Sequence, residues 1–213
     1  QDRVQAHPRL LLEFGGRADR DGVLGRTTGT PRVGVIWLTD GRGTSVLRGG
    51  FGLFFERTPS VVGAFDQFEI ATDTRYAPDG VTRLGPVGME QHVTSRNLDV
   101  ARSATWNLEW NKRATSALSF RVSALSRQGT RELVVNPLVA GPSRVDLQLT
   151  SNGRSSYREG EVTVRYAPDD KFEVTATYVR SSAFANLNAY TSFFNNIRWP
   201  VIDADEYAPV SSD

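Results

Sequence analysis

Two histidines, His7 and His92, are the side chains most able to act as a general base or a metal ligand near neutral pH. His7 lies directly before Pro8, and His92 lies in a long irregular segment. A catalytic or metal site needs a second group at a matching spacing, and neither histidine has one. The chain also has no cysteine and no Gly-x-Ser-x-Gly nucleophile motif. We therefore expect solvated loop histidines, no catalytic residue, no metal and no cofactor.

Asp19, Asp21 and Gly22 are spaced like the start of a calcium-binding loop. The acidic ligand that closes that pattern is missing downstream. Aspartate and glycine are common in turns, because aspartate hydrogen-bonds nearby backbone and glycine accepts unusual dihedral angles. We therefore expect these residues to form a solvated turn. The other neighbouring carboxylates also lie in turn or tail sequence and are expected to be solvated: Asp169 with Asp170, and Asp203 with Asp205.

Gly49, Gly50 and Gly52 suggest a phosphate-binding loop. Such a loop needs a third correctly placed glycine and a βαβ unit, and this sequence has neither. The segment 44–57 instead alternates with a two-residue period, which is typical of a β-strand. One row is apolar or small throughout, and the other mixes small and charged residues: Leu47, Gly49, Phe51, Leu53 and Phe55, against Val46, Arg48, Gly50, Gly52, Phe54 and Glu56.

Further segments show the same alternation on both sides of this central strand. They are residues 9–17, 31–38, 103–111, 115–126, 156–166 and 172–178. Short turns and long irregular segments alternate between them, the long ones being 18–30, 58–102, 127–155 and the tail from 181. We expect short strands around 65–70 within the second of these.

Two architectures fit the alternating faces. In a soluble β-sandwich the apolar rows share one buried core. In an outer-membrane β-barrel the apolar rows face lipid and the polar rows line a lumen. Alternating short turns and long loops is the layout of bacterial outer-membrane barrels, whereas a Greek-key sandwich has no reason to keep it. Charges in the middle of the polar rows also suit a wet lumen, so the pattern favours the barrel.

Composition narrows the class of protein. The 213 residues are enough for one all-β domain. A formal net charge of +1, from 25 basic and 24 acidic residues, argues against nucleic-acid binding. The mean hydropathy is -0.35 and no apolar run reaches about 18 residues, which excludes a helical membrane protein. The start has no signal peptide and both ends look cut, so we expect a fragment of a longer protein.

Three successive motifs resemble the barrel of TonB-dependent outer-membrane receptors. They are Gly-Arg-Ala-Asp at 16–19, Pro-Arg-Val-Gly at 31–34 and Leu-Arg-Gly-Gly-Phe-Gly at 47–52. Ala18 departs from the aromatic residue that is usual there. Segments 106–133 and 151–181 look like further hairpins of the same family, most like its large receptors with an N-terminal carboxypeptidase-regulatory-like domain. The resemblance extends from about residue 8 to residue 182.

The resemblance implies a wall segment of a barrel of about 22 strands around a plug domain. Such receptors take up a scarce ligand, such as an iron chelate, a vitamin or a glycan, with energy relayed by TonB. We expect residues 1–213 to be part of one transmembrane barrel domain, an antiparallel up-and-down meander of about seven or eight long strands. The chain contains no recognisable plug or TonB box. The expected partners are outer-membrane lipid, the rest of the barrel and plug, TonB through the plug, and a small ligand, in the cell outer membrane.

The alternation assigns side chains to each surface. The side chains expected to face lipid are Trp37, Phe51, Trp106, Phe120 and Val164. Those expected to face the lumen, and to pair across strands or with a plug, are Arg48, Glu109, Arg121, Glu161 and Arg165. The loop aromatics able to contact a ligand are Phe65, Phe68, Tyr76, Tyr190, Phe193 and Trp199, although packing within the loops or at the membrane interface is the favoured role.

Two other interpretations stay open at this point. One is a barrel without a plug that has a structural or adhesive role. The other is a secreted, soluble β-sandwich that acts as a binding module. The soluble interpretation requires the side chains expected to face lipid to meet in a single buried core instead.

Overall fold

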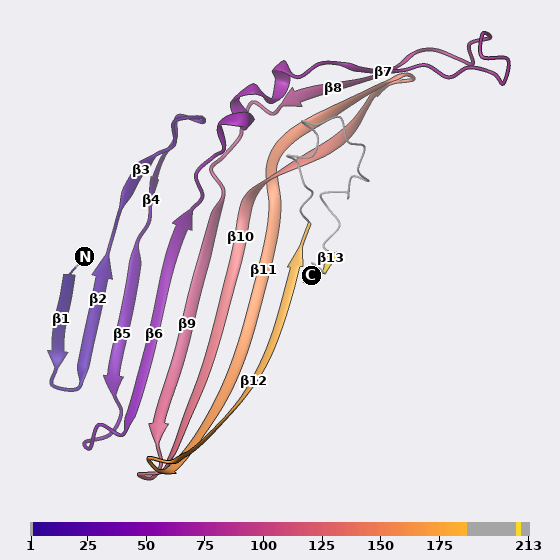
Figure 1. Ribbon diagram of the computed structural model, residues 1–213. Helices are drawn as coiled ribbons and strands as arrows, with labels where there is room; N and C mark the ends of the chain where they lie inside the picture. Colours follow the sequence, from indigo (N-terminus) through magenta and orange to yellow (C-terminus); the bar gives the residue numbers. More distant parts are fainter. Residues whose placement is uncertain (1, 187–207, 210–213) are drawn as a thin grey trace.

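The computed structural model of the chain describes residues 2–186 and 208–209. Its main feature is a curved sheet of long strands that run side by side (Figure 1). The strands follow the order β1–β2–β5–β6–β9–β10–β11–β12, and each is antiparallel to the next. The up-and-down meander predicted from the sequence is therefore confirmed.

The bounds of the meander strands are β1 (Asp2–His7), β2 (Leu10–Gly15), β5 (Arg32–Leu38), β6 (Ser45–Phe55), β9 (Arg102–Arg113), β10 (Leu118–Gly141), β11 (Arg144–Asp169) and β12 (Phe172–Ala185). The short β13 (Ala208–Pro209) pairs with the end of β12. The connections carry a hairpin, two further strands and a 3-10 helix: β3 (Ala18–Arg20), β4 (Thr27–Gly29), β7 (Ala71–Asp73), β8 (Gly88–Thr94) and η1 (Ser60–Gln67). The strand β1 was not expected from the sequence.

The two ends of the sheet differ in their connections. At one end the strands are joined by short turns at 8–9, 39–44, 114–117 and 170–171. The long connections 16–31 and 56–101 lie at the other end, together with the tip of the β10–β11 hairpin (Figure 1). This separation agrees with the alternation of short and long connections in the sequence. We call the two ends the turn end and the loop end.

The segment 127–155 is a long hairpin arm, and the expectation of an irregular loop there was wrong. Pairing between β10 and β11 continues from Gln128↔Ser156 to Val139↔Val145, with register shifts on the way. One shift falls at Arg131, which has a φ of 61° and is the extra, unpaired residue of a β-bulge. Pro137 and the Asn-Gly pair at 152–153 are residues that favour turns, but the pairing ladder accommodates them.

The segment 58–102 folds against this arm rather than forming strands at 65–70. η1 covers the first half of that stretch, and β8 pairs in parallel with β11, which places His92 opposite Leu147. Together they enclose a small apolar core made of Val62, Phe65, Leu98, Val135, Leu147 and Leu149. The buried core of the described chain therefore lies at the loop end. Among the described residues, no helix is long and apolar enough to cross a membrane.

The register sorts the strand side chains onto two faces of the sheet. Directly paired residues of neighbouring strands point to the same face. One continuous row runs Leu12, Val35, Gly49, Leu108, Ala124 and Gly160, and a second runs Leu10, Trp37, Leu47, Trp110, Val122, Val162 and Tyr178. We call the face with these rows the apolar face, and the opposite one, with Arg48, Glu109 and Arg121, the polar face.

Candidate functional site: a recess on the polar face

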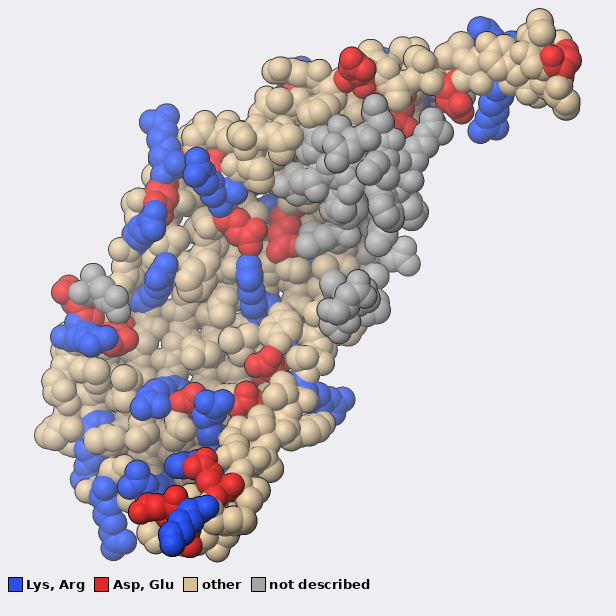
Figure 2. Space-filling view, in the orientation of Figure 1, with Lys and Arg blue, Asp and Glu red and all other residues tan. Residues whose placement is uncertain are grey.

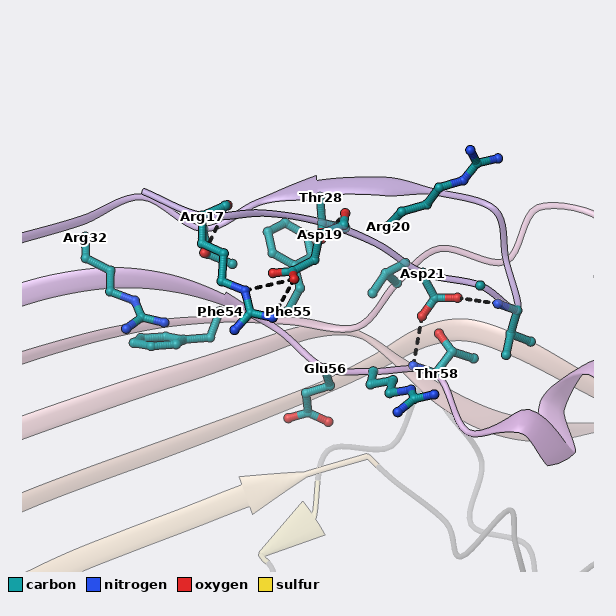
Figure 3. A pocket seen from close by; sticks show the side chains of 15 residues that line it. Arg17, Asp19, Arg20, Asp21, Thr28, Arg32, Phe54, Phe55, Glu56 and Thr58 are labelled. Atoms are coloured by element: carbon teal, nitrogen blue, oxygen red, sulfur yellow. Dashed lines mark hydrogen bonds and ion pairs between the residues drawn. The ribbon is translucent and has the colours of Figure 1, made fainter. Parts of the chain in front are cut away.

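A recess of about 590 Å³ lies at the loop end of β2, β5 and β6 (Figure 3). The β3–β4 hairpin forms one wall, and the end of β6 with the following residues to Thr58 forms the floor. Arg32 pairs with Gly52 in the ladder, and Phe54 follows two residues later, so both side chains belong to the polar face. The recess therefore opens where the polar face meets the loops.

Arg32 and Phe54 form the most regular surface of the recess. The Arg32 guanidinium carbon lies 4.9 Å from the centre of the Phe54 ring, which is a cation–π arrangement. Gly52 makes room for this ring, because a Cβ there would come within 2.9 Å of Phe54 Cε2. Within the described chain, no carboxylate forms an ion pair with Arg32. The pair thus presents a flat, cationic and aromatic surface.

Arg17 and Asp19 line the upper wall and restrain each other. Arg17 Nη2 lies 2.6 Å from Asp19 Oδ1, and both side chains are exposed to solvent. Thr30 holds this wall to β5, because its backbone N–H donates to the Arg17 carbonyl over 2.7 Å. Arg20 points away from the recess, as Figure 3 shows. Backbone pairing therefore fixes the wall, and the ion pair with Asp19 orients the Arg17 side chain on it.

Asp21 lies at the back of the recess and is buried, so the expectation of a solvated turn residue was wrong. Its Oδ1 accepts hydrogen bonds from the backbone N–H groups of Val23 and Leu24, at 3.0 and 2.8 Å. Its Oδ2 accepts one from the backbone N–H of Thr58 at 2.9 Å. Burial alone would raise the pKa of Asp21, but these hydrogen bonds outweigh it and hold that pKa below its ordinary value.

The described residues bring no three His, Cys, Asp or Glu side chains together as a metal site. The hydrogen bonds from three backbone N–H groups to Asp21 connect one loop to another. Asp21 therefore has a structural role. The residues with calcium-like spacing, Asp19 and Asp21, thus lie where Asp21 joins two loops by hydrogen bonds.

A second recess of about 410 Å³ continues the first along the polar face. Arg17 and Arg32 line both recesses. The floor of the second is hollow because glycines occupy its polar-face positions on three neighbouring strands: Gly15, Gly34 and Gly50. A ligand that enters at the loop end would therefore meet a continuous depression rather than a single pocket.

The side chains predicted to face the lumen all lie on the polar face. Arg48 Nη1 lies 3.0 Å from Glu109 Oε1, and Arg121 and Arg165 pair with Glu161 and Glu173. The pairing across strands that the sequence suggested is therefore present. In Figure 2, basic and acidic side chains lie next to each other over the strands in the same way.

The side chains predicted to face lipid share the apolar face. Trp37, Phe51 and Trp106 are 47%, 43% and 46% exposed, although they are large apolar groups. Phe120 and Val164 are partly exposed and pair directly with each other. None of the five belongs to the buried core at the loop end. The described residues thus contain no single core of the kind that the soluble sandwich requires.

The predicted loop aromatics separate into different places. Phe65 is fully buried, with its ring centre 5.0 Å from that of His92, and the ring centre of Phe68 lies 5.8 Å from that of His92. His92 is only 4% exposed, and neither ring nitrogen has a hydrogen-bond partner among the described residues, so the expectation of a solvated histidine was wrong. Tyr76 lies apart and is exposed. Tyr190, Phe193 and Trp199 lie outside the described residues.

Sequence reasoning missed the recess residues Arg17, Arg32 and Phe54 as a group. Arg17 and Arg32 belong to the motifs that carried the family resemblance, and Phe54 lies two residues after the third motif. Their meeting depends on the register that places Arg32 opposite Gly52 and on the hairpin that folds over them. The sequence motifs were enough to single out these residues. Their proximity could be recognised only from the strand register.

A meander with one apolar and one polar face, short turns at one end and long loops at the other is the architecture of an outer-membrane barrel wall. No model of a known protein family matches the sequence, and no curated protein matches it. Among solved structures, the chain is similar to the crystal structure of the outer membrane transporter YddB from Escherichia coli, with a TM-score of 0.62 and 12% identity. That similarity covers 84% of this chain and 23% of the YddB chain.

A second similar structure is the FrpB iron transporter from Neisseria meningitidis (F3-3 variant), with a TM-score of 0.48 and 13% identity. The similarity covers 84% of this chain and 28% of the FrpB chain. The chain thus spans about a quarter of the length of these transporters. The similarity to YddB shows that the chain has the fold of one part of the β-barrel of an outer-membrane transporter.

Proposed function

We propose that the chain forms part of the wall of an outer-membrane transport barrel that takes up a scarce small ligand, such as an iron chelate, a vitamin or a glycan. The observation that carries this proposal is the two-faced sheet. Large apolar side chains stand nearly half exposed on one face, and arginine–glutamate pairs cover the other. Lipid on the first side and a water-filled lumen on the second satisfy both faces. The role is transport rather than catalysis.

The unpaired edges of the sheet favour the proposal that the chain belongs to a larger barrel. Within the described chain, β1 has a neighbour on one side only, and β12 has a second neighbour only at Phe184 and Ala185. Unpaired backbone groups are costly in lipid, so only closed barrels cross a membrane as strands. We propose that further strands of the same protein close the barrel, that a plug fills it, and that TonB acts through the plug.

The recess gives the wall a role in ligand contact. It lies on the polar face at the loop end, where a ligand coming from outside would first enter the lumen. The Arg32–Phe54 surface suits a ring or a planar polar group, because it combines aromatic stacking with a guanidinium. We propose that this surface, rather than Phe65, is the wall's first contact with the ligand.

Uptake by cells tests the proposal. Cells with and without the gene are given labelled iron chelates, vitamins and oligosaccharides, with and without a protonophore that removes inner-membrane energy. We expect loss of the gene to abolish energy-dependent uptake of one ligand, and Phe54→Ala to reduce that uptake severalfold. Leu84→Ala, an exposed apolar residue in the loop 74–87, is the matched control.

Two results would contradict the proposal. The first is a protein recovered in the culture medium, as the soluble binding module requires. The second is a membrane-located protein whose loss changes adhesion or envelope strength and leaves uptake of every probe unchanged.

A further inference from the structure

Most arginines on the polar face of the sheet have a charged or aromatic partner, whereas those on the apolar face form no ion pair within the described chain. On the polar face, Arg3, Arg48, Arg121, Arg127 and Arg165 each form an ion pair with a glutamate, and Arg32 lies over Phe54. On the apolar face, the arginines form no ion pair within the described chain. They are Arg102, Arg154, Arg158 and Arg180, which we call the loop-side arginine group.

The register places this group together at the loop end of the apolar face. Arg102 and Arg154 both pair with Thr130, so the three side chains form one row across β9, β10 and β11. Arg158 lies opposite Ser126 and Ser182, and Arg180 lies opposite Gly160. Arg158 and Arg180 are therefore diagonal neighbours on adjacent strands, close enough for both to contact one group.

The group is free to bind a partner. Arg154, Arg158 and Arg180 are exposed, while Arg102 is partly buried and donates from Nε to the Thr130 hydroxyl over 3.1 Å. The apolar-face positions of β9, β10 and β12 carry no Asp or Glu, and neither do those of β11 from Arg154 to Tyr166. Four positive charges thus share a surface that supplies them with no carboxylate.

The group adjoins the apolar rows without a break. Arg158 shares its ladder row with Ser126, Trp106 and Phe51, and Arg180 follows Tyr178 two positions along β12. The surface therefore passes from exposed aromatics to exposed arginines toward the loop end. In a barrel wall this is the level at which lipid chains give way to headgroups.

We propose that the loop-side arginine group binds the phosphate groups of phosphorylated lipids in the outer leaflet. Guanidinium groups bind phosphate oxygens through paired hydrogen bonds, and diagonal arginines can hold one phosphate from two sides. Unlike the polar-face arginines that pair with glutamates, these side chains form no ion pair within the described chain, and lipid phosphates would supply the missing negative charge. The inference rests on the membrane placement proposed above but not on which ligand is transported.

Binding of defined lipids to the complete protein, purified from the outer membrane in mild detergent, tests the inference. The probes are diphosphorylated lipid A and the same lipid with its phosphates removed, each in mixed micelles and read by native mass spectrometry. Each arginine near an anionic lipid contributes about a fivefold gain in affinity, so Arg158→Gln with Arg180→Gln should weaken binding of the phosphorylated lipid about 30-fold. Binding of the dephosphorylated lipid should not change.

The control variant combines Arg26→Gln with Arg42→Gln, which removes two exposed arginines that form no ion pair in the described chain and lie away from the group. It should bind like the wild type, and Arg158→Lys with Arg180→Lys should retain part of the affinity. Equal binding of both lipids by the wild type would overturn the inference, and so would full competition by millimolar inorganic phosphate. Either result leaves membrane placement standing if the protein still fractionates with the outer membrane.

Discussion

The buried carboxylate of Asp21 accepts a hydrogen bond from the backbone N–H of Thr58 at 2.9 Å, and so joins the β3–β4 hairpin to the chain that leaves β6. The same carboxylate also accepts from Val23 and Leu24. One side chain therefore holds two loop-end connections together around the recess. Removing it leaves three backbone donors without their acceptor.

Asp21→Ala should loosen the loop end by about 1–3 kcal/mol, the cost of leaving buried hydrogen-bonding groups unpaired. We expect faster protease cleavage within 18–30 and 58–68, with the strands themselves unaffected. Asp19→Ala is the matched control, because among the described residues the Asp19 carboxylate pairs only with the exposed Arg17. Equal protection of both variants would show that Asp21 does not clasp the loops.

Gly129→Ala should destabilise the β10–β11 arm, because a Cβ at Gly129 would overlap the Glu132 carboxylate and the Ser155 hydroxyl. Overpacking of this kind costs about 1–3 kcal/mol. Gly160→Ala on β11 is the control, since nothing lies within 4 Å of its Cβ position. Urea unfolding of the reconstituted protein should separate the two variants, and a similar loss in both would refute the role of Gly129.

His92→Leu should stabilise the loop core. Both ring nitrogens of His92 are buried without a partner among the described residues, and an unpaired buried polar group costs about 1–3 kcal/mol. Leucine keeps an apolar contact with Phe65 and removes that cost. Slower proteolysis of 58–102 is the expected result. Faster proteolysis would show that the histidine makes a hydrogen bond essential to the loop.

Asp40 in the β5–β6 turn should remain mostly ionised until the pH falls to about 2. The Thr44 hydroxyl donates to its carboxylate, partial desolvation opposes this effect, and Lys112 Nζ lies 3.2 Å away, which together lower the pKa of Asp40 to about 2. Because the folded pKa is depressed, the stability that Asp40 contributes is present above the ordinary value of 3.8 and disappears as pH falls through about 2.

A carboxyl NMR titration of the reconstituted protein measures this value. In Lys112→Met the pKa of Asp40 should rise, yet stay below 3.8 because the Thr44 hydrogen bonds remain. Titration of wild-type Asp40 near 3.8 would contradict the arrangement of the turn.

Strand alternation was sufficient to predict the sheet and its faces, because successive side chains of a strand point to opposite faces and paired residues of neighbouring strands share a face. Trp37 and Arg48 could be assigned to opposite faces from their positions in the sequence. The arm 127–155 could not be predicted, because Pro137 and the Asn-Gly pair at 152–153 are turn signals that long-range pairing overrides. The recess was missed for a related reason, since Arg32 meets Phe54 only through the register.

The placement of one face in lipid is the central claim, and adjacent residues of β10 test it most directly. Val122 lies in the middle of the apolar rows, and Ser123 points to the polar face between Glu109 and Glu161. Arginine facing lipid near the bilayer midplane costs about 2–4 kcal/mol, whereas arginine between two glutamates in a wet lumen is well tolerated. Ser123→Arg is therefore the matched control for Val122→Arg.

The measurement is the amount of folded protein in the outer membrane for these two variants and the wild type. We expect Val122→Arg to reduce assembly strongly and Ser123→Arg to assemble like the wild type. Normal assembly of Val122→Arg, or failure of both variants to the same degree, would contradict the assignment of the apolar face to lipid.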